Sequence, residues 1–118
     1  TILEGFHTAF IALSKEDLIR FEAKAGDTEG VVNYALSLQG IVFAALIKES
    51  DDMIKMSFRS KGDFPANEFA KELFNGGGHK NAAGGRSESS FEETIERFKE
   101  GLKTFNNRLI ETRKTAHV

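Results

Sequence analysis

The chain has 118 residues, of which 40% are hydrophobic and 29% are charged, and its formal net charge is −2. This composition is typical of one globular domain with a sizeable core, and it excludes a generally basic nucleic-acid-binding surface. The absence of cysteine excludes disulfides and cysteine-based metal sites. The longest apolar run, Ile41–Ile47, is too short to span a bilayer, and the start at Thr1 rather than methionine suggests a fragment of a longer polypeptide.

The first predicted elements are a strand and a helix. Thr8–Leu13 is a short apolar run that is typical of a buried strand. Ser14 is a good helix N-cap with Asp17 in the first turn, which predicts a helix to about Ala23. A turn over Lys24–Asp27 follows.

A second helix is predicted from Glu29, with Asp27 or Thr28 as its cap and Gly40 at its end. Its apolar residues recur with helical spacing, so one face is expected to pack inward. The predicted inward stripe consists of Val31, Tyr34, Ala35 and Leu38.

Two strands are predicted next. Ile41–Ile47 is apolar throughout, which is typical of a central strand covered on both faces. Met53–Arg59 alternates between apolar and polar side chains, so it has one buried face and is expected to form a hairpin with the strand before it. The face away from the core carries Lys55, Ser57 and Arg59.

The second half of the chain is predicted to contain two more helices and a returning strand. After a loop with the only proline, Asn67 is expected to cap a helix that runs into Gly76. A strand over 84–89 and a long helix over 91–109 follow, and the tail after Glu111 is expected to fray. The predicted fold is α/β: a single domain, 1–118, with a mixed sheet of about four to five strands, helices packed on it and a long C-terminal helix.

The glycine-rich stretch 76–85 is the main candidate for a binding site. Three successive glycines are costly to order, so they indicate a backbone that turns sharply or is approached closely. Amide groups in a glycine loop that opens a helical turn form an anion site, to which His79 and Lys80 add donors. The alternative interpretation is a plain connector after a helix end.

The string Gly-Gly-Gly-His-x-x-Ala-Ala-Gly in this stretch resembles the signature of the DHH-associated domain, the C-terminal part of many DHH-family phosphoesterases. The resemblance covers nearly the whole chain, from about Phe6 to Leu109. It implies that this stretch faces the substrate. The implied substrate-binding residues in it are Gly76, Gly77, Gly78, His79, Lys80, Ala83 and Gly84.

Arg59 is the second candidate, because its planar fork of donors suits a phosphate. Without the resemblance, a solvated arginine at a strand end is an equal alternative. The Ser-x-Arg-Ser pattern of Ser57, Arg59 and Ser60 is similar to a strand that lies near the glycine-histidine loop in DHH phosphoesterases, which implies contact with substrate. The segment Thr28–Gly30 also resembles a family feature, in which Glu29 is expected to support the helix start.

The family resemblance implies hydrolysis with two metal ions, usually manganese, held by an N-terminal domain with an Asp-His-His motif. That motif is absent from these residues, so the chain is expected to contain no catalytic residue, bind no cofactor itself and be inactive in isolation. His7, His79 and His117 show no metal-ligand spacing. The implied role is to close over the metal site and hold the phosphates of the substrate.

The sequence is most similar to the branch that degrades very short RNAs and removes phosphate from 3′-phosphoadenosine-5′-phosphate. Cyclic-dinucleotide phosphodiesterases and exopolyphosphatase-like relatives are alternatives. The acidic charge balance favours short substrates over long polymers. The expected partners are short RNA or a nucleotide phosphate and the N-terminal DHH domain of the same polypeptide, in the cytoplasm and away from membranes, with a homodimer as a further option. Two other interpretations stay open: an RNA-binding module related to the C-terminal domain of alanyl-tRNA synthetase, and a non-catalytic interaction domain.

Overall fold

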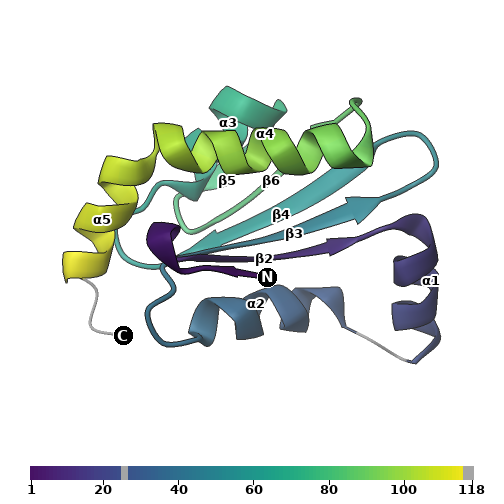
Figure 1. Cartoon of the computed structure of the whole chain (residues 1–118), viewed down its shortest axis with the longest axis horizontal. Helices are drawn as coiled ribbons and strands as arrows, with labels where there is room; N and C mark the ends of the chain where they lie inside the picture. The colour runs from purple at the N-terminus through teal and green to yellow at the C-terminus, as the bar shows by residue number, and fades with distance from the viewer. Residues whose placement is uncertain (25–26, 116–118) are drawn as a thin grey trace.

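The structure is a computed structural model and describes residues 1–24 and 27–115. These residues form a six-stranded mixed sheet in the order β1-β2-β3-β4-β6-β5, with helices on both faces (Figure 1). The strands are β1 (Ile2–Leu3), β2 (Thr8–Leu13), β3 (Phe43–Glu49), β4 (Ile54–Ser60), β5 (Gly77–His79) and β6 (Ala82–Ser87). The helices are the short 3-10 turn η1 (Glu4–Phe6) and the α-helices α1 (Lys15–Ala23), α2 (Thr28–Ser37), α3 (Ala66–Phe74), α4 (Phe91–Thr104) and α5 (Asn106–Thr115).

The predicted mixed α/β fold is confirmed, although the sheet has six strands in place of four to five. The two edge strands, β1 and β5, are only two and three residues long, so they show no alternation in the sequence. The predicted strand Thr8–Leu13 is β2, and the predicted return strand is β6, which begins at Ala82. The predicted turn over 24–27 includes residues 25–26, which lie outside the described part.

Strand β3 is the centre of the sheet. It runs parallel to β2 and antiparallel to β4. Parallel neighbours require a crossover connection, and α1 and α2 provide it on one face of the sheet (Figure 1). The residues Phe43–Ile47 are all buried, because helices cover both faces of this strand, and the run is therefore apolar throughout.

The larger core lies between the sheet and α3 and α4, and phenylalanine rings fill much of it. The ring of Phe43 lies 4.7 Å from that of Phe64 and 4.8 Å from that of Phe69. Burying one such side chain contributes about 1.5–3 kcal/mol. On the opposite face, α2 adds Val32 and Ala35 to a smaller cluster. Most of the buried apolar side chains therefore lie on the α3 and α4 side of the sheet.

The predicted inward stripe of α2 is wrong at Tyr34, whose side chain is 69% exposed. Val32, one position away from the predicted Val31, is fully buried instead. Both sets of residues keep helical spacing, so periodicity alone does not decide which way the helix faces. The helix also ends at Ser37, before Gly40.

The start of α3 differs from the prediction as well. The helix begins at Ala66 with Pro65 at its N-cap, where no side chain caps it. Asn67, the predicted cap, lies inside the helix, and its buried Oδ1 has no hydrogen-bond partner in the described residues. The N–H of Ala66 donates instead to the carbonyl oxygen of Lys80 at 2.8 Å, so the first turn of α3 is tied to the β5–β6 turn.

The predicted C-terminal helix is interrupted at Phe105, which separates α4 from α5. The Phe105 ring lies 5.2 Å from that of Phe69, and Asn106 and Asn107 are weak helix formers. α5 continues past Glu111 to Thr115, and the rest of the tail that was expected to fray, residues 116–118, lies outside the described part. None of the described helices is long and apolar enough to cross a membrane.

Candidate phosphate-binding site

The glycine-histidine stretch forms a β-hairpin rather than a loop that opens a helix. β5 pairs antiparallel with Ala82–Gly84 of β6, and Lys80 and Asn81 lie in the turn between the two strands. The prediction of a helical turn after the glycines is therefore wrong. Because β6 also pairs with β4, its backbone groups are used in the sheet, and an anion would have to be held mainly by side chains.

The three successive glycines serve different purposes. A Cβ at Gly76 would lie 1.9 Å from the carbonyl oxygen of Gly84, and Gly78 has a φ of +142, where an added Cβ would lie 2.8 Å from the Ala82 oxygen. The fold itself therefore requires glycine at these two positions. A Cβ at Gly77 would meet no atom within 4 Å. The bare surface at Gly77 is thus not needed for packing, which favours close approach by a ligand.

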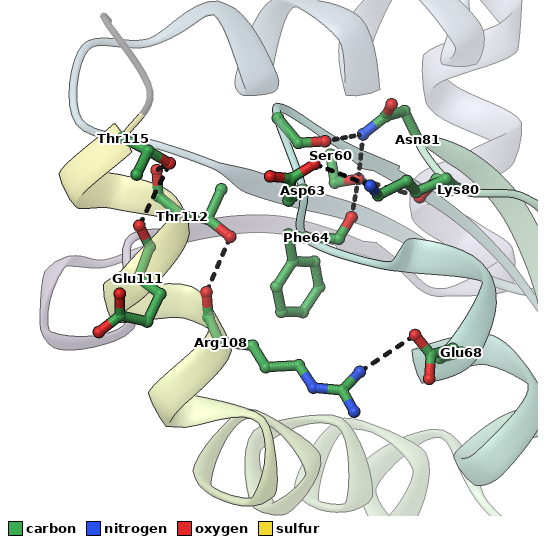
Figure 2. Close-up of polar contacts among 11 residues, drawn as sticks. Ser60, Asp63, Phe64, Glu68, Lys80, Asn81, Arg108, Glu111, Thr112 and Thr115 are labelled. Carbon is green, nitrogen blue, oxygen red and sulfur yellow. Dashed lines mark hydrogen bonds and ion pairs between the residues drawn. The ribbon is translucent and has the colours of Figure 1, made fainter.

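Hydrogen bonds fix the β5–β6 turn against the end of β4 (Figure 2). The side-chain amide of Asn81 donates to Ser60 Oγ at 2.9 Å and to the Gly62 carbonyl at 3.1 Å. The Ser60 hydroxyl donates to the Phe64 carbonyl at 2.7 Å, and the Lys80 ammonium lies 2.8 Å from the Asp63 carboxylate. The hairpin is therefore held by the loop that precedes α3.

Three of the predicted substrate-binding residues, Ser60, Lys80 and Ala83, hold the hairpin in place and do not line the face that carries Arg59. Ser60 is only 5% exposed, and Ala83 only 6%. Ala83 pairs with Phe58, so both Ala83 and Ser60 lie on the face that packs against α3. Lys80 is exposed, but its charge is paired with Asp63. None of the three side chains lies on the face of the sheet that carries Arg59.

The Lys80–Asp63 pair predicts a response to acid. The hydrogen bond from Lys80 lowers the pKa of the Asp63 carboxyl below its usual value of 3.8. A lowered pKa means that the pair is fully present above the unfolded value and is lost only as the pH falls through the folded one. In an NMR titration to low pH, the backbone amides of the turn are expected to shift below pH 3.8, and Asp63→Asn is expected to abolish that transition. A transition that persists in Asp63→Asn would contradict this assignment.

Strand register brings the remaining candidates together on one face. Residues directly opposite each other in antiparallel strands point to the same side of a sheet. Arg59 is opposite Ala82, which is opposite His79. Ser57 is likewise opposite Gly84, which is opposite Gly77.

Arg59 and His79 therefore stand on the same face, separated by two strand spacings of about 5 Å each. On this face α2 packs on β2, β3 and β4, whereas the helix that packs on β5 and β6 is α3, from the other side. His79 and Gly77 are exposed. The two predicted halves of the site are thus adjacent: Arg59 lies beside the first turn of α2, and His79 lies beyond it, where α2 does not pack on the sheet. This face of the sheet is called the open face below.

The Arg59 guanidinium is held in place by three oxygen atoms. Its side chain is 18% exposed, and Nη2 lies 2.5 Å from the carboxylate of Glu29 in the first turn of α2. Nη1 donates to the carbonyl oxygens of Phe58 at 2.9 Å and Ala83 at 3.4 Å. The expectation that Glu29 mainly supports the start of α2 is therefore incomplete, since its carboxylate binds Arg59. One edge of the guanidinium is occupied by an anion even without a ligand.

A row of cations on the same face was not predicted from the sequence. Lys48 is opposite Lys55, which is opposite Arg86. The alternation of Met53–Arg59 already placed Lys55 on the side of Arg59, but nothing in the sequence showed which residues flank it. Among residues 1–24 and 27–115, no three histidine or acidic side chains are close enough to hold a metal ion, and His117 lies outside that part. The residues described do not fit a metal site.

Comparison with known proteins assigns this mixed sheet with its glycine-histidine hairpin to a class of domain. The sequence matches the DHHA1 domain over residues 6–110, and the chain belongs to that family. It is 39% identical to an exopolyphosphatase-related protein from Bacteroides fragilis, with 92% of this chain covered and a TM-score of 0.85. The chain spans only 32% of the length of that protein. No curated protein sequence matches the chain.

More distant structures share the fold. The C-Ala domain of alanyl-tRNA synthetase from Aquifex aeolicus is 17% identical, with 80% of this chain and 89% of that domain covered at a TM-score of 0.53. The pGpG-specific phosphodiesterase PggH from Vibrio cholerae is 9% identical, with 95% of this chain and 35% of that protein covered at a TM-score of 0.52. At these identities the similarity concerns the fold alone.

Proposed function

We propose that this chain is the substrate-binding domain of a DHH-family phosphoesterase that hydrolyses short oligoribonucleotides or nucleotide phosphates. The observation that carries the proposal is the row of Arg59, Ala82 and His79 across three neighbouring strands on the open face. The contact between Glu29 and Arg59 supports it, because a carboxylate oxygen occupies a position that a phosphate oxygen would take.

In this proposal the residues of the chain bind and orient the substrate. The fork of Arg59 binds a phosphate after Glu29 is displaced, and the Ser57 hydroxyl and the His79 imidazole donate further hydrogen bonds. Gly77 leaves space for the sugar next to the strand. The two metal ions, usually manganese, and the catalytic residues belong to the N-terminal DHH domain of the same cytoplasmic polypeptide. The isolated chain is accordingly expected to position substrate without hydrolysing it.

A titration of the labelled chain with a trinucleotide RNA tests the binding site. We expect the largest NMR shift changes at Arg59, Gly77 and His79, since these residues surround the proposed phosphate position. The amides of α4, which packs on the opposite face of the sheet, serve as internal controls. Changes confined to α4 and α5 would instead favour the non-catalytic interaction domain.

The second candidate is an RNA-binding module, which the shared fold with the C-Ala domain supports. Such a module is expected to bind a structured tRNA and to ignore a trinucleotide, whereas the substrate-binding domain is expected to bind the trinucleotide. Inorganic polyphosphate in the same titration tests a further substrate class, because the Bacteroides fragilis relative is described as exopolyphosphatase-related. Tighter binding of polyphosphate than of RNA would replace the nucleotide in the proposal.

A further inference from the structure

The open face carries a second group of cations beyond the Arg59 row. Lys48, Lys55 and Arg86 are directly opposite one another on β3, β4 and β6. No ion pair or hydrogen bond of their charged groups occurs within the described part of the chain. Like charges directly opposite each other on neighbouring strands destabilise a sheet. The fold alone gives no reason for this row, in a protein whose net charge is negative.

The row borders a hollow in the surface. The hollow has a volume of about 400 Å³, and no acidic residue lines it among the residues described. Its lining includes the three cations, together with Ser57, Gly76 and Gly84. Since β5 pairs only with Ala82–Gly84, β6 continues past it as a free edge beside this hollow. The site therefore combines positive charge with space for a ligand.

The floor between the two cationic rows has almost no side chains. It consists of Ser57, Gly84 and Gly77, which are opposite one another across β4, β6 and β5. A Cβ at Gly77 would meet nothing within 4 Å, and one at Gly84 would meet only the Met56 carbonyl, at 3.3 Å. The sugar and base of a nucleoside can therefore lie against the strands between the rows.

The distance between the Arg59 row and the Lys55 row indicates how many phosphates a ligand needs to contact both. Lys55 and Arg59 are four residues apart on one strand, which is about 13 Å at the rise of a β-strand. The Arg59 guanidinium is directed toward Glu29 of α2, away from the second row, so the two rows offer separate positions for phosphates. A ligand that carries two or more phosphates with nucleosides between them can occupy both rows at once. This condition fits a short single strand of nucleic acid better than a mononucleotide.

We propose that Lys48, Lys55 and Arg86 form a second phosphate subsite, which binds an internal phosphate of a short single-stranded nucleic acid whose end phosphate is held by Arg59. This inference rests on the proposed function and extends it, because it makes the length of the strand a determinant of affinity. Single-strand binding proteins combine a basic track along the backbone with room for the bases in the same way.

The test compares ligands of different length on the 118-residue chain. Adenosine 5′-monophosphate and a 5′-phosphorylated tetra-adenylate are titrated by calorimetry into the wild type and into the double variant Lys55→Gln/Arg86→Gln. We expect the tetra-adenylate to bind about tenfold more weakly to the variant, with the mononucleotide unchanged. The salt dependence of tetra-adenylate binding is expected to fall by roughly 0.7 in log–log slope, because the contact with one phosphate is lost.

The matched control is Lys99→Gln/Lys103→Gln on α4, which removes the same charge from the opposite side of the sheet. Equal loss of tetra-adenylate binding in this control would overturn the subsite, as would unchanged binding to Lys55→Gln/Arg86→Gln. A loss of mononucleotide binding as large as that of tetra-adenylate would also overturn it. Arg59→Ala separates the two proposals: if it weakens the mononucleotide while Lys55→Gln/Arg86→Gln changes nothing, only the second subsite fails. If Arg59→Ala leaves mononucleotide binding unchanged, the proposed function fails.

Discussion

Replacing Gly76 with alanine is expected to lower the free energy of unfolding by about 3 kcal/mol or more. The new methyl group would lie 1.9 Å from the Gly84 carbonyl oxygen and 2.7 Å from the Gly85 Cα. Both are backbone atoms of the paired strand β6, so no rotation of a side chain relieves the clash. The loss is measured by urea denaturation, and a change below about 1 kcal/mol would show that the hairpin yields to the added methyl group.

The neighbouring substitution Gly77→Ala is the matched control, with the opposite expected result. A methyl group there meets no atom within 4 Å, so stability is expected to stay the same or to rise by about 0.4–1 kcal/mol through the unfolded chain. Binding of a short RNA is expected to weaken, because the methyl group fills the space where the ligand approaches. Full binding by Gly77→Ala would remove this glycine from the site.

Replacing Arg59 with alanine is expected to weaken binding of a short RNA by about 100-fold. Hydrogen bonds to charged groups contribute about 1.5–3 kcal/mol, and each 1.4 kcal/mol is a factor of ten. In the intact enzyme the same change is expected to raise KM, and to lower kcat as well if the contact tightens in the transition state. Arg59→Lys keeps the charge without the fork, so an intermediate loss is expected.

The control for Arg59→Ala is Arg108→Ala, because Arg108 is also paired with a glutamate, Glu68, at 3.1 Å but from the α5 and α3 side (Figure 2). It is expected to leave binding unchanged. Glu29→Gln is expected to strengthen binding severalfold, since the ligand no longer competes with a charged carboxylate for Arg59. Its effect on stability is expected to be small, as the Glu29 side chain is 63% exposed. Equal binding by Arg59→Ala and the wild type would remove this residue from the site.

The sequence predicts those parts of the fold in which the local pattern of residues is compatible with only one secondary structure. β2 has its predicted bounds because an apolar run ends at Ser14, whose hydroxyl accepts from the Asp17 N–H at 3.1 Å. The alternation of β4 is confirmed position by position. The break at Phe105 was missed because it depends on where the phenylalanine ring finds space among others far along the chain.

The site was predicted in its location more than in its construction. The sequence indicates that the glycines near His79 allow a sharp turn or a close approach of the backbone. The hairpin shows both, with a positive φ at Gly78 and a close contact of Gly76 with β6. The sequence does not show that Gly76 and Gly78 are required by packing while Gly77 is not, since that follows from the strand paired with them. The contact between Glu29 and Arg59 spans thirty positions, and no local pattern contains it.

The hairpin pairing of β4, β6 and β5 has a consequence for folding order. All of these strands lie between Ile54 and Ser87, joined through α3 without any parallel pairing. The parallel pairing of β2 with β3, by contrast, brings together strands that are separated in the sequence by α1 and α2. Contacts close in sequence form faster than distant ones. The antiparallel strands that carry Arg59, Lys55 and His79 are therefore able to pair early. Lys48 on β3 and the contact between Glu29 and Arg59 complete the recognition surface only when the parallel half has formed, so damage to that half is expected to alter ligand binding as well as the yield of native protein.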